Sequence, residues 1–488
     1  MVSLESVVVI ALMSSLLVVA SDDVCPYQEC SCQGSYIECQ SRHLNSVPKL
    51  VTTTNTAFKV LMLDSNRITR IVSGSLPPHL SEISVTLNAI STIDDEAFNQ
   101  SATTLETLRF DGAHFTRIPD AFLRLHNLKK LYIYNTAISD WNPAAMRNIG
   151  HTLETLFLGN VGLASWPDWM QDFSRLFNLY ISDSSFTSLP DNALTVSASS
   201  LTILSMIGGR LTAVPKTIAN HTALKSIFLQ NNQIIDITWL PHLSNLSSLC
   251  LNYNNISDAG KLSSVLRPFA HSLTSLHIFG NQLTVIPDLS YLTHIGGLDL
   301  GHNRISDPDS GAVASNLFVL SMAYNSLPSI PRVLAELTAV TEVYLPSNVI
   351  TQIKGTDFPL MTVIVRLQNN LISELADDSF PVNSSIRFLL LSNNPIATVS
   401  AHAFSNLPRL RELDLQQSKL TRLPPSLASL DHIFTVDISN STDLVCTCEE
   451  KSLQTWISSL SSYNVIGNCG DTSVYNFFTT LSLTCSTS

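Results

Sequence analysis

Residues 295–305 read Ile-Gly-Gly-Leu-Asp-Leu-Gly-His-Asn-Arg-Ile, and this stretch decides the fold. Its Leu298, Leu300, Asn303 and Ile305 occupy the defined positions of the pattern LxxLxLxxNxL. The same pattern returns at 224–234, 246–256, 273–283 and 386–396. We count about sixteen copies between Leu61 and Leu420, too many to arise by chance, and they predict a repeat architecture.

A repeat of roughly 22 to 27 residues supplies one short strand and one return segment, and it buries its leucines only against neighbouring repeats. The spacing predicts an α/β solenoid, a horseshoe of about 16–17 leucine-rich repeats with a parallel β-sheet on its concave face. The length of 488 residues therefore does not require about three globular domains, because stacked repeats add length without a new core.

Composition and charge favour binding over catalysis. Hydrophobic residues make up 45% of the chain, charged residues make up 14%, and the net charge is −12. An acidic chain argues against a nucleic-acid partner, and the small basic group around Arg117, Arg124, Lys129 and Lys130 is better explained as a solvated edge. No phosphate-binding loop, nucleophile elbow or zinc helix is present in the sequence. We expect no enzyme activity and no cofactor.

The N-terminus carries the features of an export signal. An apolar run from Val7 to Ala20 has the length of a signal-peptide core and is too short for a membrane span, although Glu5 stands where basic residues are usual. We predict a signal peptide at 1–20. Only three residues follow Cys485, so we expect a secreted, extracellular chain that reaches a membrane only through a partner.

Eight of the nine cysteines form two groups of four, one at each end of the repeats. Terminal repeats expose the core that internal repeats share, so each group is interpreted as a cap. The groups are Cys25, Cys30, Cys32 and Cys39, then Cys446, Cys448, Cys469 and Cys485, with Trp456 placed to cover the last repeat. Zinc is the alternative for either group, and export to an oxidising compartment disfavours it.

With these caps, residues 25–485 resemble the extracellular leucine-rich repeat family, which includes Slit-like guidance proteins, Toll-like receptor ectodomains and small proteoglycans. The resemblance implies first-to-third and second-to-fourth disulfide pairing in each group. Carried over, the pairs are Cys25–Cys32, Cys30–Cys39, Cys446–Cys469 and Cys448–Cys485; four cysteines alone allow three pairings. The implied organisation is a signal peptide at 1–20, a cap at 21–50, repeats at 51–443 and a cap at 444–488.

Six N-glycosylation acceptor sequences fit the secretory route. They begin at Asn99, Asn220, Asn245, Asn255, Asn383 and Asn440. Four fall in return segments on the convex side, while Asn255 follows a strand and Asn440 lies near the C-terminal cap. Glycans at these places leave most of the concave sheet open, which makes that sheet the expected binding surface.

Within each LxL unit the leucines point inward and the intervening residues point outward. Aromatic side chains gather at outward positions of the central strands, namely Tyr132, Tyr134, Phe157, Tyr180, Phe228, His277 and Phe279. Aromatic residues are enriched where proteins recognise partners, so we interpret these seven as candidate partner-binding residues. The alternative is that they are strand-compatible residues tolerated on a half-exposed wall.

The asparagine position is interrupted in repeats three to seven. Its occupants there are Ala113, Thr136, Val161, Ser184 and Gly209. Leu105, Leu153 and Leu201 are spaced 48 residues apart over the same region, which indicates a duplicated pair of repeats. We hypothesise a distinct local curvature and a ligand-facing centre there; relaxed selection on a duplicated block is the alternative.

Cys250 is the ninth cysteine, and the pattern places it outward on a concave strand, far from both caps. An exposed thiol can pair with a second chain, whereas neighbours that partly cover it would leave it unpaired.

These observations favour a secreted module that binds a protein or glycoprotein through its concave face. A structural matrix component is the first alternative, and the ectodomain of a cell-surface receptor is the second. Homodimerisation is compatible with the sequence.

Overall fold

The computed structural model describes residues 25–51 and 58–480, which form two compact units. Unit 1 takes in the chain up to Tyr132 together with Ser139–Ile149, and unit 2 takes in Ile133–Ile138 and the chain from Gly150 onward. Both units are leucine-rich repeat solenoids in which each repeat contributes a short strand. The signal peptide expected at 1–20 and Cys485 lie outside the described residues.

Unit 1 begins with an antiparallel hairpin and continues as a parallel ladder. Strand β1 (Ser31–Gln33) pairs with β2 (Tyr36–Glu38). Parallel pairing then joins β2 to β3 (Val60–Met62), β5 (Glu82–Ser84) and β7 (Thr107–Asp111) in turn. A second, two-stranded ladder of β4 (Arg70–Ile71) and β6 (Thr92–Ile93) lies in the return segments. Strand β8 (Lys130–Tyr134) contributes residues to both units.

Unit 2 repeats the parallel ladder in two sections. The first section is β9 (Thr155–Gly159), β10 (Asn178–Ser182), β11 (Ile203–Ile207), β12 (Ser226–Phe228), β13 (Ser248–Cys250) and β14 (Ser275–His277). The second is β15 (Gly297–Asp299), β16 (Val319–Ser321), β17 (Glu342–Tyr344), β18 (Ile364–Arg366), β20 (Phe388–Leu390), β22 (Glu412–Asp414), β23 (Thr435–Asp437) and β24 (Val465–Ile466). Minor pairs are β19 (Glu374–Leu375) with β21 (Thr398–Val399), and β25 (Asn468–Cys469) with β26 (Thr472–Ser473).

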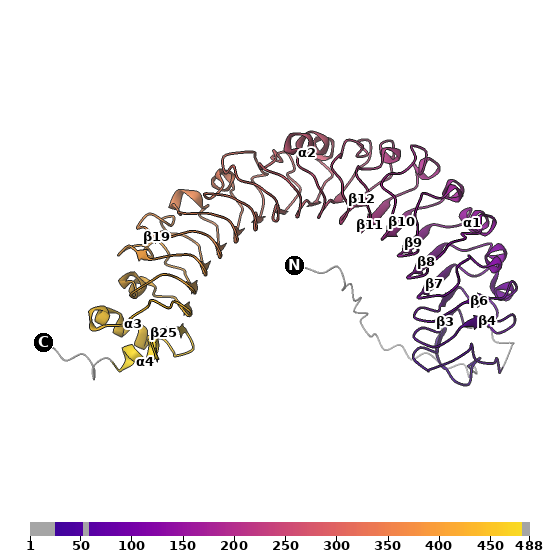
Figure 1. Ribbon diagram of the computed structural model, residues 1–488, viewed down its shortest axis with the longest axis horizontal. Coiled ribbons are helices and arrows are strands. Elements are labelled where there is room, and N and C mark those ends of the chain that lie inside the picture. Colours follow the sequence, from indigo (N-terminus) through magenta and orange to yellow (C-terminus); the bar gives the residue numbers. More distant parts are fainter. Residues whose placement is uncertain (1–24, 52–57, 481–488) are drawn as a thin grey trace. The chain divides into compact units, whose positions relative to one another are not determined.

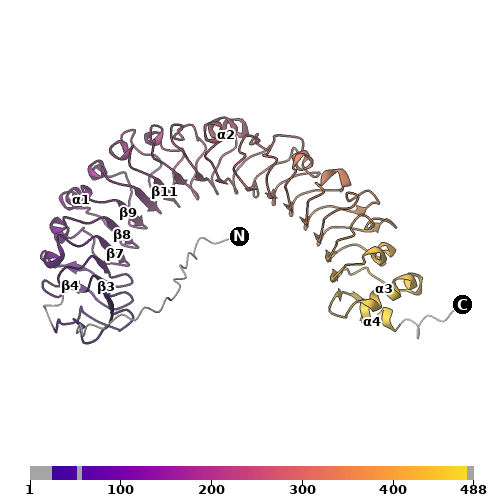
Figure 2. The same ribbon diagram turned by 180° about the vertical axis from the view of Figure 1, so that it is seen from behind.

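Helices lie in the return segments and the C-terminal cap. The α-helices are α1 (Pro143–Gly150), α2 (Ala259–Leu266), α3 (Gln454–Ser459) and α4 (Val474–Thr479). Single 3₁₀ turns are more common, at Asn99–Ser101, Asp120–Arg124, Asp168–Asp172, Thr195–Ser197, Lys216–Ile218, Arg267–Phe269, Arg332–Glu336, Gly355–Asp357, Pro425–Ser429 and Cys448–Leu453. In unit 2 the strands line the inner side of the ribbon and α2 lies on its outer side (Figures 1 and 2).

The leucines of the pattern form the core, because alternate residues of a strand point to opposite faces. Leu298 and Leu300 are 2% and 0% exposed, whereas Asp299 between them points out of the core.

The asparagine of each complete repeat forms hydrogen bonds with backbone groups just beyond the end of the strand. Asn254 is buried, its amide nitrogen donates to the carbonyls of Leu229 and Leu251 at 2.9 and 3.1 Å, and its oxygen accepts from the Ile234 N–H at 2.9 Å. The same arrangement recurs at four other asparagines, each of which donates from its side chain to two backbone carbonyls of leucine, isoleucine or methionine. These asparagines are Asn303, Asn348, Asn370 and Asn394. The side chain therefore satisfies groups that the sheet no longer pairs.

Where the asparagine is replaced, the strands are longer. Strands β7 to β11 each run for five residues, whereas β12 to β18 each run for three. Between β9 and β10 the pairing reaches Gly159 and Ser182, two residues further than the pairing of β12 with β13. Backbone-to-backbone hydrogen bonds thus continue where the amide is missing. The curvature expected for this block stays a prediction.

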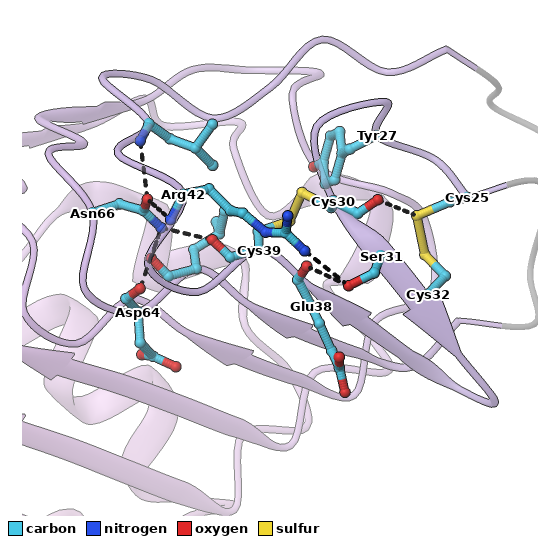
Figure 3. The surroundings of a disulfide bond; sticks show 12 residues. Cys25, Tyr27, Cys30, Ser31, Cys32, Glu38, Cys39, Arg42, Asp64 and Asn66 are labelled. Carbon is cyan, nitrogen blue, oxygen red and sulfur yellow. Dashed lines mark hydrogen bonds between the residues drawn. A yellow bond between two sulfur atoms is a disulfide. The ribbon is translucent and has the colours of Figure 1, made fainter.

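Disulfides lie near both ends of the described chain. Cys25 is joined to Cys32, Cys30 to Cys39, and Cys446 to Cys469, so these thiols are not zinc ligands. Figure 3 shows the N-terminal pair beside the first strands. At the other end the Trp456 indole donates to the Leu430 carbonyl at 3.2 Å, which anchors α3 on the last repeats. Cys448 is also disulfide-bonded, while its implied partner Cys485 lies outside the described residues.

Candidate functional site

Three of the predicted aromatic residues form one group, which we name the aromatic stack: Tyr134, Phe157 and Tyr180. They occupy outward positions on β8, β9 and β10 and are half-buried. The Phe157 and Tyr180 rings are parallel, with centroids 3.8 Å apart, and Tyr134 lies 6.1 Å from Phe157. Gly159 makes room for the Tyr134 ring, because a Cβ there would come within 2.5 Å of it.

Tyr132 belongs to unit 1 and is held differently. The Arg109 guanidinium lies 4.0 Å from its ring centroid, and the Arg109 Nε also bonds Glu82 at 3.0 Å. A cation over the ring covers one aromatic face, so Tyr132 offers a partner less apolar surface than the stack.

The next two predicted residues stand apart from the stack. Ser205 on β11 lies between Tyr180 and Phe228, which interrupts the row of rings. His277 is exposed, and one of its ring nitrogens lies 2.9 Å from the Ser275 hydroxyl.

Cys250 fits the second of the two alternatives, an unpaired thiol that its neighbours cover. It lies between Phe228 and His277 on the outward side of the sheet, yet its side chain is only 6% exposed. Burial raises the pKa of the thiol, and a hydrogen bond to the backbone of Asn252 acts weakly in the opposite direction. The protonated, covered thiol is a poor candidate for pairing with a second chain.

Phe279 joins a second group, which we name the aromatic ridge: Tyr253, Phe279, His302 and Tyr324. The ring centroids of successive members are 5.2, 4.7 and 4.1 Å apart, so one continuous row of rings spans four repeats. Tyr253 and Tyr324 are 53% and 52% exposed. The ridge therefore presents more open aromatic surface than the stack.

Three of the four ridge residues occupy a backbone position that disfavours bulky side chains. Tyr253, His302 and Tyr324 each precede the asparagine of their repeat and have φ of 54°, 51° and 55°. Asn231, Asn369 and Asn393 fill the same position in other repeats, as expected, since asparagine tolerates the left-handed region. A bulky residue there costs about 1 to 3 kcal/mol, and such strain is concentrated at functional sites.

Sequence reasoning identified Phe279 but missed the other three members of the ridge. They lie just after the strands, outside the LxL window in which outward residues were sought. Aromatic residues at the position before the asparagine, where Asn and Gly are usual, were the signal that could have revealed them.

The six acceptor asparagines are all exposed, as accessible glycosylation sites must be. The acidic residues near the C-terminal end are engaged locally: Gln416 donates from its backbone to Asp414 at 3.0 Å and from its side chain to Asp437 at 2.9 Å. Burial raises the pKa of Asp414.

Within 25–51 and 58–480, no helix has both the length and the apolar character needed to cross a membrane. The same residues contain no cluster of three or more His, Cys, Asp or Glu side chains arranged to hold a metal ion.

A family model described as leucine rich repeat matches residues 363–441. Bovine lumican is 30% identical over 221 residues, which cover 43% of this chain and 62% of lumican. Mouse podocan is 26% identical over 396 residues, which cover 74% of this chain and 60% of podocan. The chain thus spans less than two thirds of the curated relatives it matches, and the match to human leucine-rich repeats and immunoglobulin-like domains protein 2 covers 11% of that protein.

Among solved structures, a chain from the TLR13–ssRNA13 complex superposes with a TM-score of 0.62 at 19% identity, covering 86% of this chain and 72% of that one. At this identity the likeness concerns the fold. Together the comparisons show that this chain is similar to leucine-rich repeat proteins, lumican and podocan among them.

Proposed function

We propose that this chain, a leucine-rich repeat protein of the extracellular type with cysteine caps, is a secreted recognition module that binds a protein or glycoprotein through the sheet side of unit 2. The aromatic ridge is the observation that carries the proposal. Four adjacent rings form a broad aromatic surface on which Tyr253, His302 and Tyr324 are exposed, and aromatic residues dominate binding energy at protein interfaces.

Backbone strain supports the same assignment. Gly280 lies between Tyr253 and His302 in the series of positions before the asparagine, and its φ is +69°. A Cβ at Gly280 would come within 2.7 Å of the Tyr253 ring, so glycine allows that ring to lie across the neighbouring repeat. In the two neighbouring repeats a bulky ring occupies this position, although glycine suits the left-handed backbone better. Stability alone does not favour rings there, whereas recognition does.

The test separates binding from folding. Replacing Tyr253 and Tyr324 with glycine removes two exposed rings while suiting the left-handed backbone, so secretion and thermal stability should not fall. Affinity capture from extracellular fluid identifies a partner, and its dissociation constant is then measured for each purified variant. We expect the double variant to weaken binding about 30-fold or more, equivalent to about 2 kcal/mol.

Two further variants sharpen the result. Tyr324→Asn creates the acceptor sequence Asn-Asn-Ser at 324–326, and a glycan there should block the ridge sterically. Phe434→Ser removes another exposed ring, 67% exposed, away from the ridge and should leave binding unchanged. Equal affinity in the wild type and the double variant would move the binding surface elsewhere. Replacing Phe157 and Tyr180 with serine then tests the aromatic stack.

Similarity to lumican and podocan also keeps a matrix role as the second candidate. Recovery of insoluble extracellular polymer in place of a stoichiometric protein complex would favour that role.

A further inference from the structure

A hollow of about 430 Å³ lies in the return segments of unit 2, apart from both aromatic groups. We name it the Trp239 hollow. The residues that line it include Asp191, Thr195, Lys216, Asn220, Thr238 and Trp239. Its volume lies in the range of sites that hold small organic groups.

The lining combines one aromatic wall with a polar rim. Trp239 is 37% exposed, and the Lys216 ammonium lies 5.6 Å from its ring centroid. Lys216 also bonds the Asp191 carboxylate at 2.6 Å, and Thr195 and Thr238 add hydroxyls. A pyranose ring has an apolar C–H face bordered by hydroxyl and amide groups, which matches an aromatic wall with donors and acceptors beside it.

One lining residue is itself a predicted sugar attachment point. Asn220 begins the acceptor sequence Asn-His-Thr, is exposed, and makes no side-chain hydrogen bond to the described residues. During glycosylation its Nδ2 loses a proton and bonds to C1 of the first N-acetylglucosamine, while the pyrophosphate of a lipid-linked oligosaccharide leaves. The first sugars are then tethered at the hollow, where even weak contacts are favoured by high effective concentration.

We infer that the Trp239 hollow is the binding site for the N-acetylglucosamine core of the glycan on Asn220. The core packs against the Trp239 indole, and the Lys216–Asp191 pair bonds its polar rim. This packing covers the aromatic surface on the outer side of unit 2 and directs the rest of the glycan outward. The inference rests on the export proposed above but not on partner binding, so the two are tested by separate measurements.

The experiment uses the full chain secreted from cells that make only oligomannose glycans. An endoglycosidase that cuts between the two core N-acetylglucosamines is added to the folded protein, and release at each site is followed by peptide mass spectrometry. Asn245, an exposed acceptor in the next repeat, is the internal control. If the core occupies the hollow about 90% of the time, release from Asn220 is about tenfold slower than from Asn245.

Trp239→Ala should raise the Asn220 rate to that of Asn245 without changing the Asn245 rate. If Trp239→Ala is not secreted, Lys216→Ala replaces it, because the Lys216 side chain is 52% exposed and its loss should not impair folding. Denatured protein should release both glycans equally, which removes any preference of the enzyme for one sequence. Equal rates in the folded wild type, slow release that persists in the variant, or an unmodified Asn220 would each overturn the inference.

Discussion

At the scale of single residues, each buried asparagine side chain forms hydrogen bonds that strand pairing would otherwise supply. Asn254 satisfies two carbonyls and one N–H that would otherwise be buried without partners. An unsatisfied buried polar group costs about 1 to 3 kcal/mol, more than a typical hydrogen bond contributes.

Asn254→Ala should therefore lower the free energy of unfolding by about 2 to 4 kcal/mol. Asn192→Ala is the control, because Asn192 is exposed, and it should change stability by less than about 0.5 kcal/mol. Equilibrium denaturation in urea measures both. A change below about 1 kcal/mol for Asn254→Ala would mean that water or a backbone shift replaces the amide.

His221 predicts how stability responds to pH. Burial lowers the pKa of its ring below the usual 6.5, and this effect outweighs that of the nearby backbone groups of Leu194, Thr217 and Ile218, which acts in the opposite direction. The unfolded chain therefore binds a proton at mild acidity more readily than the folded chain does. Its contribution to stability is present above the unfolded pKa and is lost as pH falls through the folded value.

We expect the melting temperature to fall between about pH 7.5 and about pH 5.5, and to fall less in His221→Leu, which keeps the glycosylation sequence at Asn220. Thermal melts at both pH values measure the difference. Identical pH dependence in the two proteins would show that other groups govern the response.

At the scale of elements, the missing asparagines and the five-residue strands occur together in repeats three to seven. Val161 is 1% exposed at the asparagine position and follows β9. If the longer ladder already satisfies the local carbonyls, an amide placed there finds no partner. If relaxed selection alone removed the asparagine from this repeat, restoring the amide would instead stabilise it.

Val161→Asn should thus destabilise unit 2 by about 1 to 3 kcal/mol. Val161→Thr is the matched control, because Thr136 fills the equivalent position of the preceding repeat and its hydroxyl donates to the Tyr134 carbonyl at 2.7 Å. Denaturation curves for both variants decide between the explanations. If Val161→Asn stabilises the protein, relaxed selection on this repeat is the better explanation.

At the scale of the whole molecule, each repeat contacts mainly its neighbours, so stability is approximately a sum of local terms along the solenoid. The ends are then the weakest places, and the disulfides lie there. In the N-terminal cap, Tyr27 is fully buried and its hydroxyl donates to the Ser75 carbonyl at 2.6 Å, which links the cap to the return segment of a repeat. Burial raises the pKa of Tyr27, which keeps it protonated.

Replacing Cys30 and Cys39 together with serine should cost about 2 to 4 kcal/mol at that end and lower secretion. Hydrogen exchange should accelerate in β2 and β3 but not in β16 to β18, because nearest-neighbour coupling confines the effect. Uniform acceleration throughout the chain would show that the solenoid unfolds as a single cooperative unit.

The sequence by itself was enough to predict the repeats, their inward leucines and the outward positions of Tyr134, Phe157 and Tyr180. These features depend on a period that each repeat carries in its own residues, and the parallel leucine-rich repeat fold is confirmed. For Cys250 the sequence left two alternatives open, and the structure favours the covered, unpaired thiol, because neighbouring strands bury a side chain that alternation places outward.

Only the tertiary structure revealed the aromatic ridge and the Trp239 hollow. Three of the ridge residues have a left-handed backbone after their strands, and their rings meet that of Phe279. The hollow collects side chains from residues 191 to 242. Such surfaces arise between repeats, at distances set by stacking. A pattern read within one repeat specifies what is buried, whereas the packing of neighbouring repeats decides what is displayed together.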